Sequence, residues 1–195
     1  LWRRLLKGDL SQAGYRPLKV YLQMESSVRP VFWAGVLCMA ATPFIDLSTV
    51  DLNQIYADRK AIYEVLPHRF EFEQLDAIVA VYPEQAIGIA RRDVREDEFW
   101  VRGHIPGRPL MPGVLMIESA AQIASYLTST FRIAEGFLGF ARVDEVSFRG
   151  TVSPPATMYF IMKLIERRSR RVVGDAQGFV DGRLVFEGRI TGMPV

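Results

Sequence analysis

The segment from Val114 to about Phe131 constrains the fold most, because it has helical periodicity and almost no polar face. Apolar side chains occupy most of its circumference: Leu115, Met116, Ile117, Ala120, Ala121, Ile123, Ala124 and Leu127. A helix of this kind is normally buried, so other elements must surround it. A chain of 195 residues is long enough to form one domain around such a helix.

Extended segments lie on both sides of this helix. Their apolar and β-branched content predicts strands over residues 75–82, 86–94, 140–149, 157–166, 172–180 and 184–192. Their connections are short, and Asp181-Gly182 is the clearest hairpin signal among them. One long buried helix among antiparallel strands predicts an α+β fold in which the sheet wraps around the helix.

The chain divides at about residue 50. Residues 1–50 lack clean periodicity, so we interpret them as an N-terminal extension. This extension is either genuine or the product of a wrongly assigned start, with Met24 or Met39 as the true beginning. Residues 51–195 form the predicted domain, which opens with a helix from Asp51 that Leu66-Pro67 ends.

Composition narrows the classes of function. The formal net charge of +2 gives no bulk argument for nucleic-acid binding. A single cysteine, Cys38, excludes an internal disulfide framework. Two histidines and one cysteine far apart in sequence are a poor ligand set, so we expect neither a metal nor another cofactor. The longest apolar stretch, residues 31–45, is shorter than the roughly 20 residues of a membrane span, and we expect a cytoplasmic protein.

A loop rich in glycine and proline directly precedes the long helix. Within residues 103–113, three prolines and three glycines surround His104, and such a backbone can hold one tightly turned path. Histidine suits proton abstraction because its ordinary pKa lies near neutral pH. At the start of the helix, the backbone N–H groups of Gly113 and Val114 are candidates for polarising a carbonyl oxygen.

Glu118 is the second candidate for chemistry, about one turn into the helix. On a largely apolar element, desolvation is expected to raise the pKa of its carboxyl and favour an acid role. A base, an acid and a carbonyl-polarising helix end suffice to remove a proton α to a carbonyl and expel a β-hydroxyl. Two simpler interpretations stay open. His104 is then a structural loop residue, and Glu118 belongs to a narrow solvated stripe with Gln122, Ser125 and Ser129.

The block Gly103–Gln122 resembles the β-hydroxyacyl-[acyl carrier protein] dehydratases of fatty acid biosynthesis. Their signature is a glycine-histidine-aromatic-proline-glycine loop that continues through Met-Pro-Gly-Val to Glu-x-x-x-Gln. Ile105 stands here where the family has an aromatic residue. The segments Leu66–Phe72 and Val143–Arg149 are similar to further parts of the family, so the resemblance extends from about residue 52 to about residue 190.

The resemblance implies a hot-dog fold and a dimer as the minimal active unit, alone or in a trimer of dimers. One subunit supplies the histidine, which maps to His104, and its neighbour supplies the glutamate, which maps to Glu118. Gly113 maps to the carbonyl-polarising N–H, and Gln122 maps to the glutamine that follows the glutamate on the helix. Together with Val114 at the helix start, they are the residues expected to bind the substrate. The substrate implied is a (3R)-3-hydroxyacyl thioester on acyl carrier protein, and the product is a trans-2-enoyl thioester.

Several other residues have two interpretations. Phe99 and Trp100 either line an acyl tunnel or belong to the core, whereas His68 is interpreted as structural. Glu73 and Gln74 replace two apolar residues of the family, so we expect their segment to be more exposed. A basic cluster is either a solvated hairpin end or a docking surface for the acidic carrier protein that the resemblance implies. The basic cluster consists of Arg167, Arg168, Arg170 and Arg171.

Two rival functions remain. A hot-dog thioesterase needs a carboxylate that activates water, but it has no evident use for a histidine mounted in a glycine- and proline-rich loop. A non-catalytic acyl-binding subunit conflicts with the presence of both His104 and Glu118.

Overall fold

The structure is a computed structural model that describes residues 42–195. Its main elements, in chain order, are β1 (Ala57–Asp58), α1 (Arg59–Val65), β2 (Ala77–Tyr82), β3 (Ile87–Val94), α2 (Gly113–Thr130), β4 (Leu138–Phe148), β5 (Ala156–Arg168), β6 (Arg171–Val180) and β7 (Arg183–Pro194). Short 3-10 turns lie at Leu47–Thr49, Phe70–Phe72 and Pro83–Gln85. None of the helices in this part of the chain is long and apolar enough to cross a bilayer.

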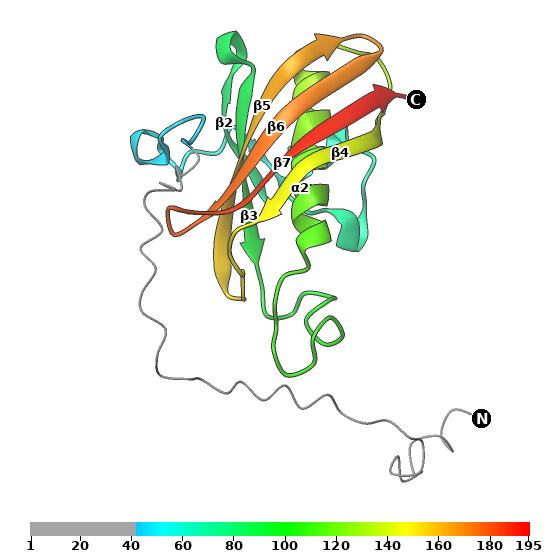
Figure 1. Cartoon of the computed structure of the whole chain (residues 1–195). Coiled ribbons are helices and arrows are strands. Elements are labelled where there is room, and N and C mark those ends of the chain that lie inside the picture. The colour runs from blue at the N-terminus through cyan, green and yellow to red at the C-terminus, as the bar shows by residue number, and fades with distance from the viewer. Residues whose placement is uncertain (1–41) are drawn as a thin grey trace, which may run out of the picture. The chain divides into compact units, whose positions relative to one another are not determined.

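The strands form a single antiparallel sheet. Within residues 42–195, seven strands follow the order β1-β2-β3-β5-β6-β7-β4, so the short β1 and the long β4 are the two edges. The helix α2 lies against one face of this sheet (Figure 1). The α+β arrangement predicted from the sequence is therefore confirmed.

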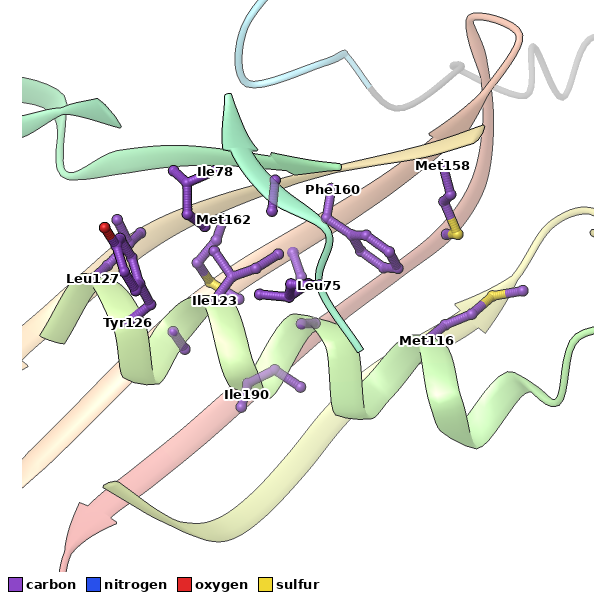
Figure 2. Close-up of a cluster of buried hydrophobic side chains, with 14 of the residues drawn as sticks. Leu75, Ile78, Met116, Ile123, Tyr126, Leu127, Met158, Phe160, Met162 and Ile190 are labelled. Atoms are coloured by element: carbon purple, nitrogen blue, oxygen red, sulfur yellow. The ribbon is translucent and has the colours of Figure 1, made fainter. Parts of the chain in front are cut away.

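The core between α2 and the sheet consists of large apolar side chains. Ile123 and Leu127 on α2 are fully buried, as are Phe160 on β5 and Phe186 on β7. Figure 2 shows side chains from the helix and several strands converging in this space. Truncating one such side chain to alanine typically costs about 2–5 kcal/mol of stability. This packing fixes the position of α2 and hence of the functional groups that it carries.

The opposite face of the sheet carries a second apolar cluster. Its buried members are Val79, Ile87, Ile89, Ile161 and Phe179. They alternate along the strands with the residues of the first core, as the period of a β-strand requires. Phe44, Ile45, Leu47, Val50 and Leu52 pack over them.

The buried Gln177 fixes this covering segment. The backbone N–H of Phe44 donates to its Oε1 at 2.9 Å, and its Nε2 donates to the carbonyl of Thr42 at 3.2 Å. The described part of the predicted extension thus packs on the sheet. Residues 1–41 lie outside the described part, and a domain boundary near residue 50 stays a prediction.

The predicted helix from Asp51 to Leu66 is wrong over its first half. Helix α1 begins only at Arg59, where the Asp58 carboxylate caps it by accepting a hydrogen bond from the N–H of Ala61 at 2.8 Å. The preceding Ala57 and Asp58 pair with β2 as strand β1. Strand pairing and the cap therefore override the helical periodicity of residues 51–56.

Candidate active site

His104 lies in the loop between β3 and α2, which extends beyond the end of the sheet (Figure 1). Its side chain is exposed, and its backbone N–H donates to the carbonyl of Trp100 at 2.8 Å. The ring Nδ1 lies 2.9 Å from the carbonyl oxygen of Leu110. Because a carbonyl only accepts, Nδ1 carries the proton of the neutral ring, and Nε2 keeps a free electron pair. Nε2 is therefore the basic atom.

Buried groups anchor the two ends of this loop. At the first end, Trp100 is 4% exposed and donates from Nε1 to Glu98 Oε2 at 3.2 Å. Trp100 thus belongs to the core, which was one of its two interpretations, whereas Phe99 is 55% exposed. At the second end, the N–H of Met111 donates to the carbonyl of Val152 at 2.8 Å.

Helix α2 begins at Gly113 with no side-chain cap, because Pro112 occupies the N-cap position. The N–H groups of Gly113 and Val114 lack intrahelical acceptors and can bind a carbonyl oxygen. Val114 is 68% exposed. A Cβ at position 113 would lie 2.7 Å from the Phe148 ring, so any side chain larger than that of glycine would displace this ring.

The Glu118 carboxylate is half-buried and accepts hydrogen bonds at Oε1. Gln122 Nε2 donates to it at 2.7 Å, and His68 Nε2 lies 3.3 Å away. The carboxylate opens into a pocket of about 80 Å³. Its other walls are mostly apolar, with Ala121, Ser125, Phe137, Leu138, Gly139, Phe140, Ile190 and Gly192.

Gln122 is 1% exposed, and protein groups occupy both ends of its amide. Its Oε1 accepts from the Tyr63 hydroxyl at 2.8 Å and from the N–H of Gln74 at 3.2 Å. Its Nε2 donates to the Phe72 carbonyl at 2.7 Å as well as to Glu118. These partners fix the orientation of the amide. Gln122 therefore fixes the orientation of the Glu118 carboxylate, and its expected role in substrate binding stays a prediction.

The pKa of Glu118 is the balance of two opposing effects. Burial raises it, but the hydrogen bonds from His68 and Gln122 and a smaller electrostatic effect of His68 together outweigh burial, and the pKa lies below its ordinary value. The expectation of a raised pKa was wrong because it took account of the apolar helix but not of these two donors. Glu118 is thus held as a carboxylate at neutral pH.

His68 is the site residue that sequence reasoning missed. It was interpreted as structural, yet it lines the Glu118 pocket and contacts the carboxylate. The signal available was its place in Leu66–Phe72, one of the segments that carry the family resemblance. Its contact with Glu118 could not be seen from spacing, since 50 residues separate the two.

Within residues 42–195, His104 and Glu118 form no hydrogen bond or ion pair with each other. The polar partner of His104 is Leu110, and the partners of Glu118 are His68 and Gln122. Within one chain, hydrogen bonds therefore fix the His104 imidazole and the Glu118 carboxylate separately, and the two groups do not contact each other.

The expected exposure of the Glu73-Gln74 segment was wrong for Gln74. Gln74 is 2% exposed, and its side-chain oxygen accepts a hydrogen bond from the buried Arg92. Arg92 in turn forms an ion pair with Glu98 at 3.0 Å. Polar residues can replace apolar ones here because Gln74, Arg92 and Glu98 satisfy one another's hydrogen-bonding groups.

The basic cluster lies at the end of the β5–β6 hairpin, and all four of its arginines are exposed. Glu166 lies 3.4 Å from Arg168 and 3.8 Å from Arg171. In the sheet, Val172 next to the basic cluster pairs with Gly192, and Gly192 also pairs with Phe140. Gly192 and Phe140 line the Glu118 pocket. The basic cluster therefore lies at the same end of the sheet as the pocket.

A solved dehydratase heterocomplex, ApeI:P from Xenorhabdus doucetiae, has a similar fold. The match has a TM-score of 0.57 at 16% identity and covers 69% of this chain and 91% of that chain. At this identity the likeness concerns the fold alone, and it confirms the hot-dog fold that the sequence resemblance implied.

Sequence comparison is more specific. A protein of Desulfotalea psychrophila is 31% identical over 136 residues, which are 68% of this chain and 90% of that protein. A protein of Enterococcus faecalis is 34% identical over 133 residues, 68% of this chain and 94% of that protein. Both are named 3-hydroxyacyl-[acyl-carrier-protein] dehydratase FabZ. Residues 66–189 match the family described as the FabA-like domain, and the chain therefore belongs to the FabA-like family.

Proposed function

We infer that this chain is a 3-hydroxyacyl-[acyl carrier protein] dehydratase of fatty acid biosynthesis, the activity for which its relatives are named. The observation that carries the inference is that hydrogen bonds orient two side chains, the imidazole of His104 and the carboxylate of Glu118. The Nδ1 of His104 is hydrogen-bonded to the Leu110 carbonyl, which leaves Nε2 without a protein partner among the described residues, and Glu118 presents a fixed carboxylate at a pocket with mostly apolar walls. A base and a carboxylate that are each held in a fixed orientation suit the elimination of water from a 3-hydroxyacyl thioester.

The reaction proceeds on a (3R)-3-hydroxyacyl thioester as follows. His104 Nε2 removes a proton from C2, and the electron pair of that C–H bond forms the C2–C3 double bond as the C3–O bond breaks. The N–H groups of Gly113 and Val114 bind the thioester oxygen, where negative charge develops. The proton on His104 then passes to the departing hydroxyl, so water leaves, a trans-2-enoyl thioester remains, and the imidazole is neutral again.

Glu118 orients the departing hydroxyl in this scheme. Because its pKa is lowered, its carboxylate accepts a hydrogen bond from the C3 hydroxyl rather than donating a proton. One base therefore both removes and returns the proton, and no second acid is required.

We propose that each Glu118 works with His104 of a second copy of the chain. The edge strand β4 supports this, since Phe140, Val143 and Phe148 on it are 51%, 38% and 52% exposed. Val114 and Ile105 add exposed apolar surface at the start of α2 and beside His104. A long edge strand with apolar side chains is a surface that natural proteins cover. A trimer of such dimers stays a prediction.

We also propose that the basic cluster docks the acidic carrier protein. Its position at the pocket end of the sheet supports this, because the carrier must deliver the acyl group there. Exposed positive charge steers an acidic partner and is screened beyond about 10 Å at about 0.1 M salt.

The docking proposal is tested by reversing Arg167 and Arg170 to Glu. Within residues 42–195 neither has an ion-pair partner, so the fold should tolerate the change. KM for carrier-bound substrate should rise several-fold and lose salt sensitivity, while KM for the same acyl group on pantetheine stays constant. Arg183→Glu, an exposed arginine at the other end of β6, is the matched control. Equal weakening of both substrates would contradict docking.

The function is tested by following the absorbance of the conjugated enoyl thioester over a chain-length series of 3-hydroxyacyl thioesters. Free thiol, measured in parallel, reports a thioesterase instead, and tight binding without either product reports a non-catalytic subunit. His104→Ala should lower kcat by about 10²–10⁴-fold. Its melting temperature should not change, because the side chain is exposed. Near-wild-type turnover by this variant would refute the assignment of the base.

A further inference from the structure

We propose that His68 is a positioning residue, which holds the Glu118 carboxylate through an Nε2–H hydrogen bond so that Oε2 faces the substrate hydroxyl. The inference rests on the proposed function, and it adds to that function a third residue from outside the loop–helix signature. His68 belongs to the segment between α1 and β2, so it is contributed by the same chain as Glu118.

The geometry fixes His68 on three sides. Its Nε2 lies 3.3 Å from Glu118 Oε1, and the two side chains are only 17% and 27% exposed. Its ring packs edge-on against Phe137, with centroids 6.0 Å apart at an interplanar angle of 62°. Behind it, Arg69 Nη1 donates to the carbonyls of Leu66 and His68 at 2.9 and 2.6 Å. The ring is therefore held by its backbone and by its neighbours.

The surroundings of the ring determine its tautomer. Nδ1 is buried, and within residues 42–195 it has no hydrogen-bond partner. A proton on Nδ1 alone would leave a buried N–H without an acceptor and would leave Nε2 without a donor for the carboxylate. The tautomer with its proton on Nε2 donates to the carboxylate instead.

His68 and Gln122 both reach the same carboxylate oxygen. Gln122 approaches Oε1 from one turn further along α2, and His68 approaches it from outside the helix. Within the described residues no hydrogen-bond donor reaches Oε2. The two donors thus fix the carboxylate plane and leave Oε2 for the substrate.

Few titratable groups face this contact. From α1, the Tyr63 hydroxyl reaches Glu118 only through Gln122, and burial raises the pKa of Tyr63, so it remains a donor. From β4 and β7, the pocket receives Phe140, Ile190 and glycine backbone. Among the residues that line the pocket, His68 and Glu118 are therefore the titratable pair.

Substitutions at residue 68 separate positioning from packing. His68→Leu removes the donor but keeps apolar bulk, and it should lower kcat by about 10–100-fold, as expected for loss of a hydrogen bond to a charged group. The acidic limb of the kcat/KM profile should move to higher pH, because Glu118 loses a donor that lowers its pKa. His68→Gln keeps an N–H at similar reach and should restore both quantities to within about fivefold. Glu71→Leu, at an exposed position of the same segment, is the control.

The outcomes distinguish the inference from the function on which it rests. A wild-type chain that produces no enoyl thioester refutes the function. With an active wild type, a folded His68→Leu variant within threefold of it and with an unmoved acidic limb refutes the role of His68. If His68→Leu does not fold, His68→Asn replaces it, since its shorter amide cannot reach Glu118. Equal activities of the Asn and Gln variants would then overturn the proposal.

Discussion

At the scale of single residues, His104 and Glu118 are oriented by different kinds of partner. The imidazole of His104 is set by a backbone carbonyl, that of Leu110, inside its own loop. The carboxylate of Glu118 is set by side chains that come from two other parts of the chain, His68 directly and Tyr63 through Gln122. The orientation of the His104 ring therefore depends on the local path of the loop, whereas that of the Glu118 carboxylate depends on tertiary packing.

The pH dependence of stability tests whether Glu118 is held as an anion. Its folded pKa is depressed, so its contribution to stability is present above the unfolded value of about 4.3 and is lost as pH falls through the folded value. The free energy of unfolding of the wild type relative to Glu118→Gln should therefore fall between about pH 6 and about pH 3.

Urea unfolding at a series of pH values measures this difference. Glu71→Gln, which removes an exposed carboxyl, serves as the control and should show a much weaker dependence. A Glu118 difference that is constant over the whole window would mean that the two donors do not stabilise the charged form.

The sequence singles out His104 and Glu118 as candidates because the loop and the helix adjoin in sequence, but it does not predict the contacts that set the pKa of Glu118. His68 and Tyr63 lie 50 and 55 positions before Glu118, and no local pattern links them to it. The direction of the Glu118 pKa shift depends on these distant donors, and for that reason it was predicted with the wrong sign.

At the scale of elements, the start of α2 is fitted closely against β4. A Cβ at residue 113 would lie 2.7 Å from the Phe148 ring, which is 52% exposed and can swing outwards. Gly113→Ala should gain up to about 1 kcal/mol of helix propensity, which offsets part of the repacking cost. We therefore expect a stability within about 1 kcal/mol of wild type.

Activity should respond more than stability to Gly113→Ala. The new methyl group and the displaced Phe148 crowd the N–H groups that we propose bind the thioester oxygen, and kcat should fall by about tenfold or more. Urea unfolding and steady-state kinetics on the same preparation compare the two effects. The double variant Gly113→Ala/Phe148→Leu identifies the cause. Recovery of kcat would assign the loss to the ring, whereas unchanged kcat in Gly113→Ala alone would remove this helix end from the mechanism.

Elements with strong local signals were predicted well. The strands over residues 157–166 and 172–180 correspond to β5 and β6. At the β6–β7 turn that follows, Asp181 and Gly182 have φ of 48° and 72°, as a tight hairpin requires. The helix expected from Asp51 failed because β1 pairing with β2 is a long-range interaction. Periodicity reports which residues are apolar, but it does not report which partner they meet.

At the scale of the whole molecule, the segment 44–52 acts as a cover for the outer face of the sheet. A chain beginning at Met39 retains this cover and should melt and turn over like the full chain. A chain beginning at Asn53 loses it and exposes Ile87, Ile161 and Phe179, each worth about 1.5–3 kcal/mol when fully buried. Thermal unfolding of the two chains should differ clearly. Equal melting temperatures would show that the cover contributes nothing to stability.

Subunit mixing tests the shared site and the role of His68 together. In the proposed dimer, each site takes His104 from one copy and both Glu118 and His68 from the other. A mixed dimer of His104→Ala and Glu118→Ala chains then contains one site with every group intact. With equal amounts and random exchange, half of the dimers are mixed, so activity should recover to about a quarter of the wild-type value.

The same reasoning shows that mixtures containing His68→Leu chains reveal which subunit contributes His68 to each site. Mixed with His104→Ala, His68→Leu should also recover towards about a quarter of wild-type activity, because the altered groups fall in one site and leave the other intact. Mixed with Glu118→Ala, it should not rise above the average of the two variants, because each site then carries one altered group. Exchange is verified by mass spectrometry of differently tagged chains. Recovery in the mixture with Glu118→Ala would place His68 with the other subunit's Glu118. If activity does not recover in the mixture with His104→Ala, despite proven exchange, each site is built within one chain.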